Sequence, residues 1–454
     1  MSEDSPNDVP SWEQPFDRKT LLARAGGAGA ALALGGLVPS LAGASIRDNG
    51  TVSVYFGQHT TIPEQDALRN FINPHFNGKI SGAFAAPGTN FTDRPIAEQK
   101  AGNIKTDVLL SLHGDMVSLQ NAGALRDVSD LAAQLKAVVP DPLMKLGKLG
   151  TNKQWYIPFE QATYIMVANK SVLKLMPKGA DLHALTYGQL LAWAKNIKAS
   201  TGQSRFGLPA SDLGLIHRFF QGFTVPSFSG GMVTTFRSPL AVASWEYLSA
   251  LWKYTHPQSL TYSFMQDPLL SGEVLLAWDH VARLKTALDQ KPDELVAFPV
   301  PRGPKARSYM PVVVGLAIPA GATPNLAGAK AYIKFMLSIS TQAQILSLLG
   351  FLPIVPGRLS KRISPGLLAE AAAVRRQTKA KDAVQALLPV GIQDQGGNFN
   401  KIYRDTFTRT VLNHEPIPNV LNEQGNALQA IFDKTGAPCW SPDPPSGKAA
   451  CKVK

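Results

Sequence analysis

The sequence predicts an α/β protein of two domains, with doubly wound sheets covered by helices on both faces. Three observations lead to this prediction. From residue 51 onward, short apolar runs typical of strands alternate with helix-forming segments, in the order strand, helix, strand, helix, strand. The chain has 454 residues, which is too long for one compact core. Its 44% hydrophobic and 17% charged residues are typical of a globular protein.

The expected elements follow this alternating pattern along the chain. In the first part we expect strands at 52–56, 79–84 and 107–112 and helices at 63–71 and 94–101. In the middle part we expect paired or crossing strands at 155–159 and 163–167 and capped helices at 186–200 and 239–254. The later expected elements are strands at 274–277, 295–300 and 311–318, helices at 281–290, 326–338 and 342–349, and a mainly helical stretch to about residue 434.

The first 44 residues predict an export signal. A polar start and the pair Arg18-Lys19 precede an uncharged Ala/Gly-rich run, which ends in a small-x-small cleavage site before residue 45. The leader resembles a twin-arginine signal, but Lys19 stands where that family has its second arginine, so the general secretory route stays an alternative. Pro39 and the many glycines argue against a permanent membrane span. Since no cysteine lies near the cleavage site, we expect no lipid anchor.

The charge pattern does not predict nucleic-acid binding. The formal net charge is +12, and the leader contains more acidic than basic residues, so its removal leaves the mature chain more basic. The basic residues are scattered, however, which is typical of a solvated surface. Their densest group lies on one predicted helix and comprises Arg375, Arg376, Lys379 and Lys381.

The two cysteines, Cys439 and Cys451, both lie in the last sixteen residues. They are too few for a disulfide framework or a zinc site, but they can close one short loop in an oxidising compartment.

The sequence contains no motif of a common enzyme class. It has no GxSxG, HExxH, P-loop or CxxC motif, and its eight histidines lack metal-ligand spacing. We therefore expect no catalytic residue, no metal and no cofactor. One alternative is a secreted glycan hydrolase or lyase in which Asp279 and Glu160 act as acid and base, because such pairs come from distant sequence positions.

The stretch 271–290 contains the strongest single candidate for a binding site. The apolar run 274–277 predicts a buried strand, and Trp278 and Asp279 follow where this strand should end. Ligands of open α/β sheets bind at strand ends. The alternative is that Trp278 belongs to the core and Asp279 caps the following helix.

Several segments, in this order, resemble the extracellular solute-binding proteins of carbohydrate ABC transporters, of the family 1, maltodextrin-binding type. The similar segments are an export signal, the βαβαβ start, 156–159 followed by 164–170, 272–278, a proline-rich connector at 299–304, and 327–335 with Gln342 downstream. The resemblance covers residues 50–435, which is nearly all of the mature chain.

This resemblance implies a two-lobed periplasmic receptor whose chain crosses a hinge about three times. One lobe would contain residues 45–155 and 305–356, the other 156–304 and 357–435, and residues 436–454 would form a flexible tail. A carbohydrate would bind in the cleft between the lobes and pass to the transmembrane permease subunits of an ABC transporter. The protein would be a monomer without a nucleic-acid partner.

A sugar has apolar C–H faces and a rim of hydroxyls, so its receptor needs aromatic plates together with carboxylates or amides. We expect Trp278 to be such a plate and Asp279 to accept a hydroxyl. The other expected ligand-binding residues lie after the first and third strands, at the hinge crossings, in the central strand or in a polar loop near the end: Gln58, His59, His113, Asp115, Glu160, Tyr309, Gly315 and Asn398.

Each of these residues also has a structural alternative. His59 and His113 can be ordinary loop residues, Asp115 a helix cap and Tyr309 a hinge packing residue. Where many relatives have a tryptophan after the first strand, this chain has Phe56-Gly57-Gln58. The sequence therefore does not identify the particular sugar. A phosphorylated or acidic sugar is an alternative, for which the anion partners would be Arg237, Arg302 or Arg307.

Overall fold

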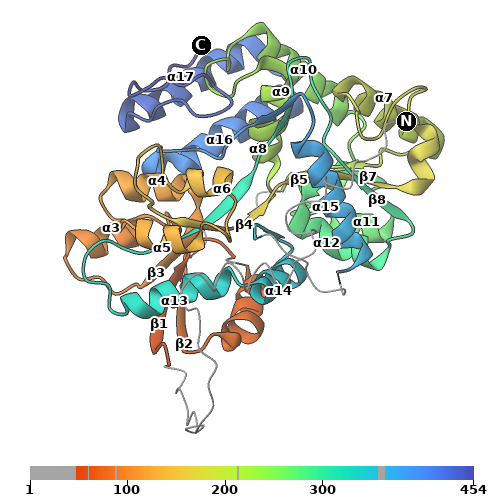
Figure 1. Cartoon of the computed structure of the whole chain (residues 1–454). Coiled ribbons are helices and arrows are strands. Elements are labelled where there is room, and N and C mark those ends of the chain that lie inside the picture. The colour runs from red at the N-terminus through yellow and green to blue at the C-terminus, as the bar shows by residue number, and fades with distance from the viewer. Residues whose placement is uncertain (1–47, 60, 87–88, 212–213, 356–362) are drawn as a thin grey trace, which may run out of the picture.

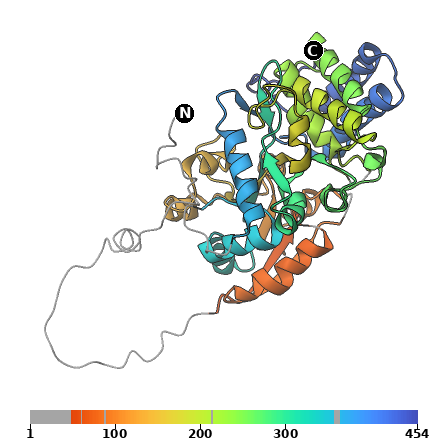
Figure 2. The ribbon, with the colours of Figure 1, turned by 90° about the vertical axis from the view of Figure 1, so that its right-hand side faces the viewer.

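The computed structural model describes residues 48–59, 61–86, 89–211, 214–355 and 363–454 (Figure 1). The predicted export signal lies outside the described residues. Two lobes are visible, each built on its own sheet, and Figure 2 shows them from the side. No described helix combines the length and the apolarity needed to cross a membrane.

The first lobe contains a six-stranded sheet in the order β11-β4-β10-β3-β1-β2. Its strands are β1 (Thr51–Phe56), β2 (Lys79–Phe84), β3 (Val108–Leu112), β4 (Ile157–Ala162), β10 (Val312–Ala317) and β11 (Leu352–Pro353). The first three strands are parallel, as predicted, whereas β4, β10 and β11 pair in antiparallel fashion. All six residues of β10 are buried, which agrees with the central position expected of this apolar run.

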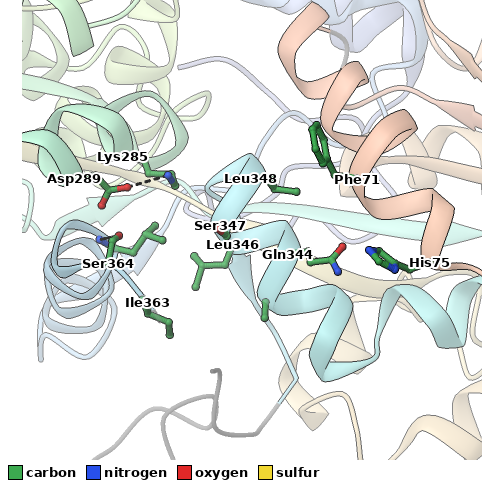
Figure 3. A pocket seen from close by; sticks show the side chains of 12 residues that line it. Phe71, His75, Lys285, Asp289, Gln344, Leu346, Ser347, Leu348, Ile363 and Ser364 are labelled. Carbon is green, nitrogen blue, oxygen red and sulfur yellow. Dashed lines mark hydrogen bonds and ion pairs between the residues drawn. The ribbon is translucent and has the colours of Figure 1, made fainter. Parts of the chain in front are cut away.

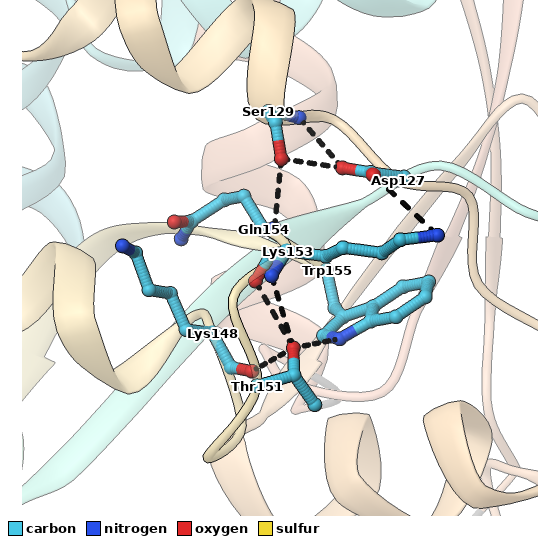
Figure 4. A network of polar contacts seen from close by, with 7 residues as sticks. All are labelled: Asp127, Ser129, Lys148, Thr151, Lys153, Gln154 and Trp155. Carbon is cyan, nitrogen blue, oxygen red and sulfur yellow. Dashed lines mark hydrogen bonds and ion pairs between the residues drawn. The ribbon is translucent and has the colours of Figure 1, made fainter.

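Helices surround this sheet (Figure 1). They are α2 (Ile62–Ala67), α3 (Asp93–Lys100), α4 (His113–Asn121), α5 (Ser129–Leu135), α6 (Asp141–Leu146), α13 (Leu326–Met336) and α14 (Ile339–Leu349), with the short segments η1 (Leu68–Ile72) and η2 (Asn73–His75). A polar network fixes the loop before β4 (Figure 4). Thr151 Oγ1 accepts hydrogen bonds from Lys153 N and from the indole N–H of Trp155, and Ser129 Oγ accepts one from Gln154 N.

The second lobe contains a four-stranded sheet in the order β6-β7-β5-β8. Its strands are β5 (Tyr164–Asn169), β6 (Phe206–Gly207), β7 (Leu276–His280) and β8 (Leu295–Phe298). The longer helices are α7 (Tyr187–Thr201), α10 (Pro239–Trp252), α12 (Val281–Gln290), α15 (Pro365–Thr378), α16 (Gly396–Phe407) and α17 (Ile417–Thr435). The shorter ones are α8 (Ile216–Phe219), α9 (Val225–Ser229), α11 (Gln266–Ser271), η3 (Lys170–Leu175), η4 (Phe220–Thr224), η5 (Pro257–Leu260), η6 (Gln393–Gln395) and η7 (Thr408–Leu412).

Strand β7 differs from the prediction in its position. It was expected at 274–277, but the ladder to β5 joins Met166 to Trp278, Ile165 to Asp279 and Tyr164 to His280. Trp278 and Asp279 therefore lie within the strand and not beyond its end.

The chain passes between the two sheets at three places. The first is Thr163, between β4 and β5, so the two runs in the middle of the sequence are crossing strands. The prediction assigned β4 to the second lobe, whereas its pairing with β10 places it in the first. At the second passage, β9 (Arg307–Tyr309) pairs with β12 (Ala383–Gln385) just before β10 begins. The third passage lies between β11 and α15.

The C-terminal segment 436–454 is not the flexible tail that its composition predicted. Cys439 and Cys451 form a disulfide, with their Cα atoms 4.6 Å apart. Within the closed loop, the carboxylate of Asp443 is 4% exposed and accepts backbone N–H bonds from Met232, Val233 and Thr234 at 2.7–3.1 Å. The cross-link and these bonds order a segment whose proline, serine and glycine content alone suggests flexibility.

Candidate binding cleft

Trp278, predicted to be an exposed plate for a sugar, is packed in the core of the second lobe. Its side chain is 0% exposed, and its ring stacks on Tyr164 with centroids 4.8 Å apart and planes 8° apart. The rings of Phe219 and Phe223 pack edge to face with Trp278, at centroid distances of 4.7 and 5.4 Å. All four rings belong to the second lobe, so opening of the lobes would leave Trp278 buried. The structure therefore corresponds to the alternative in which this residue is core.

Asp279 is also fully buried, and its two oxygens already have donors. Met265 N and His280 N donate to the carboxylate at 2.8 and 2.7 Å, and burial raises its pKa to about 6. The expected capping role belongs to His280 instead, whose Nδ1 accepts from Ala282 N at 3.2 Å. Asp279 joins the end of β7 to the loop at Met265, which explains its carboxylate without a ligand.

Polar residues from both lobes line a small cavity of about 90 Å³. The first lobe contributes Asp115 and Ser118 of α4, and the second contributes Arg218 of α8, Gln393, and Asn400 of α16. Drug-sized ligands occupy pockets of roughly 300–1,000 Å³, so the lobes here lie closer together than a bound sugar requires.

Close approaches across the cleft agree with a closed arrangement of the lobes. A Cβ atom on Gly114 would lie 2.1 Å from the carbonyl oxygen of Pro389, and one on Gly350 would lie 2.8 Å from Cα of Ala282. Both contacts join the first lobe to the second. Gly114 therefore allows the start of α4 to meet the opposite wall.

Asp115 lies where its prediction requires, on the wall of the cleft. Burial raises the pKa of its carboxyl, while the hydroxyl of Ser111, which donates to it, and the charge of Arg218 act in the opposite direction. Its carboxylate is thus positioned by a neighbour on its own lobe and faces a cation on the other.

The sequence analysis did not identify Arg218. Its Nη1 donates to Gln221 Oε1 at 3.1 Å, and Gln221 Nε2 donates to Asn400 Oδ1 at 3.1 Å. Burial lowers the pKa of the guanidinium, although Tyr164 and Asp115 oppose this effect. One sequence signal was present, because the basic pair His217-Arg218 interrupts the otherwise apolar run 214–220.

His59 and Glu160, which were predicted separately, form one buried pair. His59 Nε2 lies 2.5 Å from Glu160 Oε1, and neither side chain is exposed. Burial alone lowers the pKa of His59, but the charge and hydrogen bond of Glu160 outweigh it, so the net pKa is raised. Pairing limits the cost of burying these groups.

The backbone of His59 is strained. It has φ = 60°, a left-handed conformation that is uncommon for residues other than glycine and is concentrated at functional sites. The ring meets Phe351 at 4.8 Å, and Phe351 meets His280 of the second lobe at 5.4 Å. These three rings connect the lobes at the base of the cleft.

Several other predicted residues have structural roles. His113 Nδ1 lies 2.8 Å from the hydroxyl of Tyr156, and burial lowers the pKa of His113 to about 4. A Cβ on Gly315 would lie 2.2 Å from the Tyr156 ring, so Gly315 makes room for this ring. Tyr309 is 6% exposed and accepts a hydrogen bond from Gln385 at the hinge, which corresponds to its packing alternative.

Two predicted residues are not buried: Gln58 is partly exposed and Asn398 is exposed. Gln58 follows β1, directly before His59, and Asn398 lies in the first turn of α16, where its Nδ2 donates to Gln395 Oε1 at 2.9 Å.

The three arginines proposed as anion partners are engaged elsewhere. Arg237 binds the carbonyl of Val453 and the side chain of Asn426. Arg302 pairs with Asp382 at 2.7 Å. Arg307 is 4% exposed and donates to the carbonyl of His183. Each of these side chains already has a partner within the protein, so none of them requires an anionic ligand.

A larger cavity of about 430 Å³ lies between η1 and α14 of the first lobe and α12 and α15 of the second (Figure 3). Its lining is partly aliphatic, with Leu346, Leu348 and Ile363, and includes the ion pair of Lys285 and Asp289 at 2.9 Å. One wall begins at Ile363, directly after residues that the structure does not describe. None of the residues predicted to bind ligand lines it, so we place the candidate cleft at the smaller polar cavity.

The family model of bacterial extracellular solute-binding proteins matches residues 76–343. The chain belongs to this family. The two-lobed α/β structure and this match together confirm the predicted fold. A comparison with curated protein sequences finds no match.

Solved structures of solute-binding proteins share the fold at low identity. The GacH receptor of Streptomyces glaucescens has a TM-score of 0.64 at 17% identity, covering 85% of this chain and 98% of that one. Maltose-bound MalE3 of T. maritima has 0.63 at 17%, covering 84% and 100%. UgpB of Mycobacterium tuberculosis, in complex with glycerophosphocholine, has 0.62 at 16%, covering 85% and 99%.

Proposed function

We propose that this protein is an exported, non-catalytic carbohydrate receptor that closes around its ligand and delivers it to the permease of an ABC transporter. The observation that supports the proposal most directly is the polar cavity between the lobes, with Asp115 on one wall and Arg218, Gln393 and Asn400 on the other. Side chains on opposite walls can contact one ligand simultaneously only when the lobes are closed. Ligand binding would thus favour closure.

The ligands of structural neighbours support a sugar as the ligand class. GacH was solved with acarbose, MalE3 with maltose and RafE with raffinose. Amide and carboxylate groups of the kind found in this cleft accept and donate the hydrogen bonds that hydroxyls need. Of the residues predicted from sequence, we retain Asp115, Gln58, His59, Glu160 and Asn398 as contacts or supports of the ligand.

We propose no hydrolase or lyase activity. The suggested acid and base do not present two free carboxylates, because Asp279 accepts two backbone N–H bonds inside the second lobe and Glu160 is paired with His59. We further propose that residues 1–44 direct export to the periplasm, by the twin-arginine route, and that the mature protein is monomeric.

The test uses the mature protein and a panel of maltotriose, raffinose and chitobiose. We expect at least one sugar to raise the melting temperature saturably and to be recovered intact, because a ligand that binds only the native state stabilises it. Asp115→Ala should abolish this rise. The control Asp66→Ala, an exposed position of α2, should retain it. Release of smaller sugars would contradict the proposal, and so would an equal rise in both variants.

A further inference from the structure

Positive charge gathers around one histidine in the second-lobe wall of the cleft. His217 is 4% exposed, and its Nδ1 has no hydrogen-bond partner within the described part of the chain. Burial, followed by the charges of Arg218, Arg404 and Arg283, lowers its pKa. These arginines come from α8, α16 and α12, and each is partly buried. Helices α8 and α16 pack against each other, which brings Arg218 and Arg404 to the same wall, and the charge of Arg283 on α12 also reaches His217.

None of these three arginines forms an ion pair with a carboxylate of the described residues within 4.0 Å. Among described arginines elsewhere, Arg94 pairs with Glu98, Arg302 with Asp382, and Arg409 with Glu415 and Glu423. Others, such as Arg126 and Arg205, instead donate to backbone carbonyl oxygens. Partly buried charges without a partner are costly, so a group that supplies the missing charge would stabilise this wall.

The hydrogen bonds of the three leave donors free. Arg218 uses Nη1 for Gln221, and Arg283 uses Nη1 for the carbonyl of Ser263 at 2.9 Å. The side chain of Arg404 makes no hydrogen bond to the described residues. A guanidinium has five N–H donors, so most donors of this cluster are available.

The carboxyls that face the cluster offset its charge only in part. Asp115 on the opposite wall accepts from Ser111, and Asp279 accepts from two backbone N–H groups. Burial raises the pKa of both, that of Asp279 to about 6, while the charges of Arg218 and Arg283 act in the opposite direction. Neither carboxyl forms an ion pair with an arginine within 4.0 Å.

One of the three arginines lines the cavity, and a second lies one helical turn from a residue that does. Arg218 lines it directly. Asn400 also lines it, and Arg404 follows four positions later on α16, which places the two on the same helix face. An oxyanion in the cavity could therefore be reached from Arg218 on one helix and Arg404 on another.

We propose that the ligand of this cleft is a sugar or polyol bearing an oxyanion, a phosphate ester or a carboxylate, and that Arg218 and Arg404 bind this group. The inference rests on the proposed receptor function and narrows its ligand class. Guanidinium groups bind carboxylate and phosphate oxygens through paired, charge-assisted hydrogen bonds. The net charge of +12 would also attract an anionic ligand toward the protein.

The test measures binding by titration calorimetry to the mature protein at low and high salt. The probes are glycerol 1-phosphate, glucose 6-phosphate and glucuronate, with glycerol and glucose as uncharged counterparts and inorganic phosphate as the free anion. We expect an anionic probe to bind at least ten-fold more tightly than its uncharged counterpart, and this preference to weaken at high salt. Tighter binding of the phosphates than of glucuronate would indicate a phosphate ester as the ligand group, and the reverse would indicate a carboxylate.

The variant Arg404→Gln isolates the proposed contact. It should weaken binding of the anionic probe ten-fold or more, while the melting temperature without ligand should not fall, because the Arg404 side chain has no hydrogen-bonded partner to lose and its charge is unpaired. The control is Lys401→Gln, which removes one charge from the exposed side of the same helix, where Lys401 pairs with Asp405.

The outcomes separate this inference about the ligand from the proposed receptor function. If the neutral oligosaccharides bind and the anionic probes do not, this inference is overturned while the receptor function stands. If Arg404→Gln and Lys401→Gln weaken the anionic probe equally, the attraction is general and the assigned contact is wrong. If inorganic phosphate binds as tightly as the phosphorylated polyols, the site holds a free anion and not a sugar derivative.

Discussion

The substitution Trp278→Ala tests whether this ring is core or ligand contact. The indole is 0% exposed and contacts three aromatic rings at centroid distances of 4.7–5.4 Å. Replacing a buried tryptophan by alanine typically costs about 3–5 kcal/mol, of which each aromatic pair contributes about 0.5–1.5 kcal/mol. We therefore expect the free energy of unfolding to fall by about 4 kcal/mol, a large part of the 5–15 kcal/mol typical of a domain.

The assay is urea unfolding of the ligand-free protein, followed by far-ultraviolet circular dichroism. The control is Trp155→Ala, because Trp155 is partly exposed and its N–H bond to Thr151 lies in a surface loop (Figure 4). That variant should lose about 1 kcal/mol. If Trp278→Ala unfolds like the wild type but no longer binds sugar, the ring is a ligand plate and its placement in the core is wrong.

Three further predictions concern closure, the C-terminal segment and pH. Gly114→Ala places a Cβ 2.1 Å from the carbonyl oxygen of Pro389, so calorimetry should show weaker sugar binding at an unchanged melting temperature. The control is Gly188→Ala, which should bind sugar normally because its Cβ would meet nothing closer than 4.0 Å. Asp443→Ala leaves buried N–H groups unpaired and should lower the free energy of unfolding in urea by about 2–4 kcal/mol. The control is Asp433→Ala at an exposed position, and a similar loss in that variant would refute the role assigned to Asp443. The pKa of His113 is lowered from 6.5 to about 4. The neutral side chain therefore contributes up to about 3 kcal/mol to the free energy of unfolding above pH 6.5, and this contribution is lost as pH falls toward 4. The free energy of unfolding of His113→Gln should depend less on pH in this window, and identical pH profiles of the two proteins would contradict this reasoning.

The candidate site was predicted in part. Asp115 and Asn398 were expected at the cleft because they follow a strand or lie in a polar loop. The structure places Asp115 on the cavity, where Gln393 and Asn400, which flank Asn398 in sequence, also lie. Arg218 was missed because its neighbours Asp115 and Asn400 are far away in sequence and come from two other helices. Likewise, His59 and Glu160 are 101 positions apart, and nothing local indicates that they pair.

The periodicity of apolar residues predicts the α/β fold and most of its elements, because burial of one face of a helix or strand imposes a repeat that is visible in the chain. It did not determine the direction of Trp278. Strand β7 is buried on both faces, so its apolar run has no alternation that marks where the strand ends, and only pairing with β5 places Trp278 inside it. Composition also failed at residues 436–454, because the bonds of Asp443 join this segment to residues more than 200 positions away, in addition to the short loop that the disulfide closes. The tertiary structure alone decided which charges meet across the cleft, since that depends on how two lobes and three chain crossings are arranged in space.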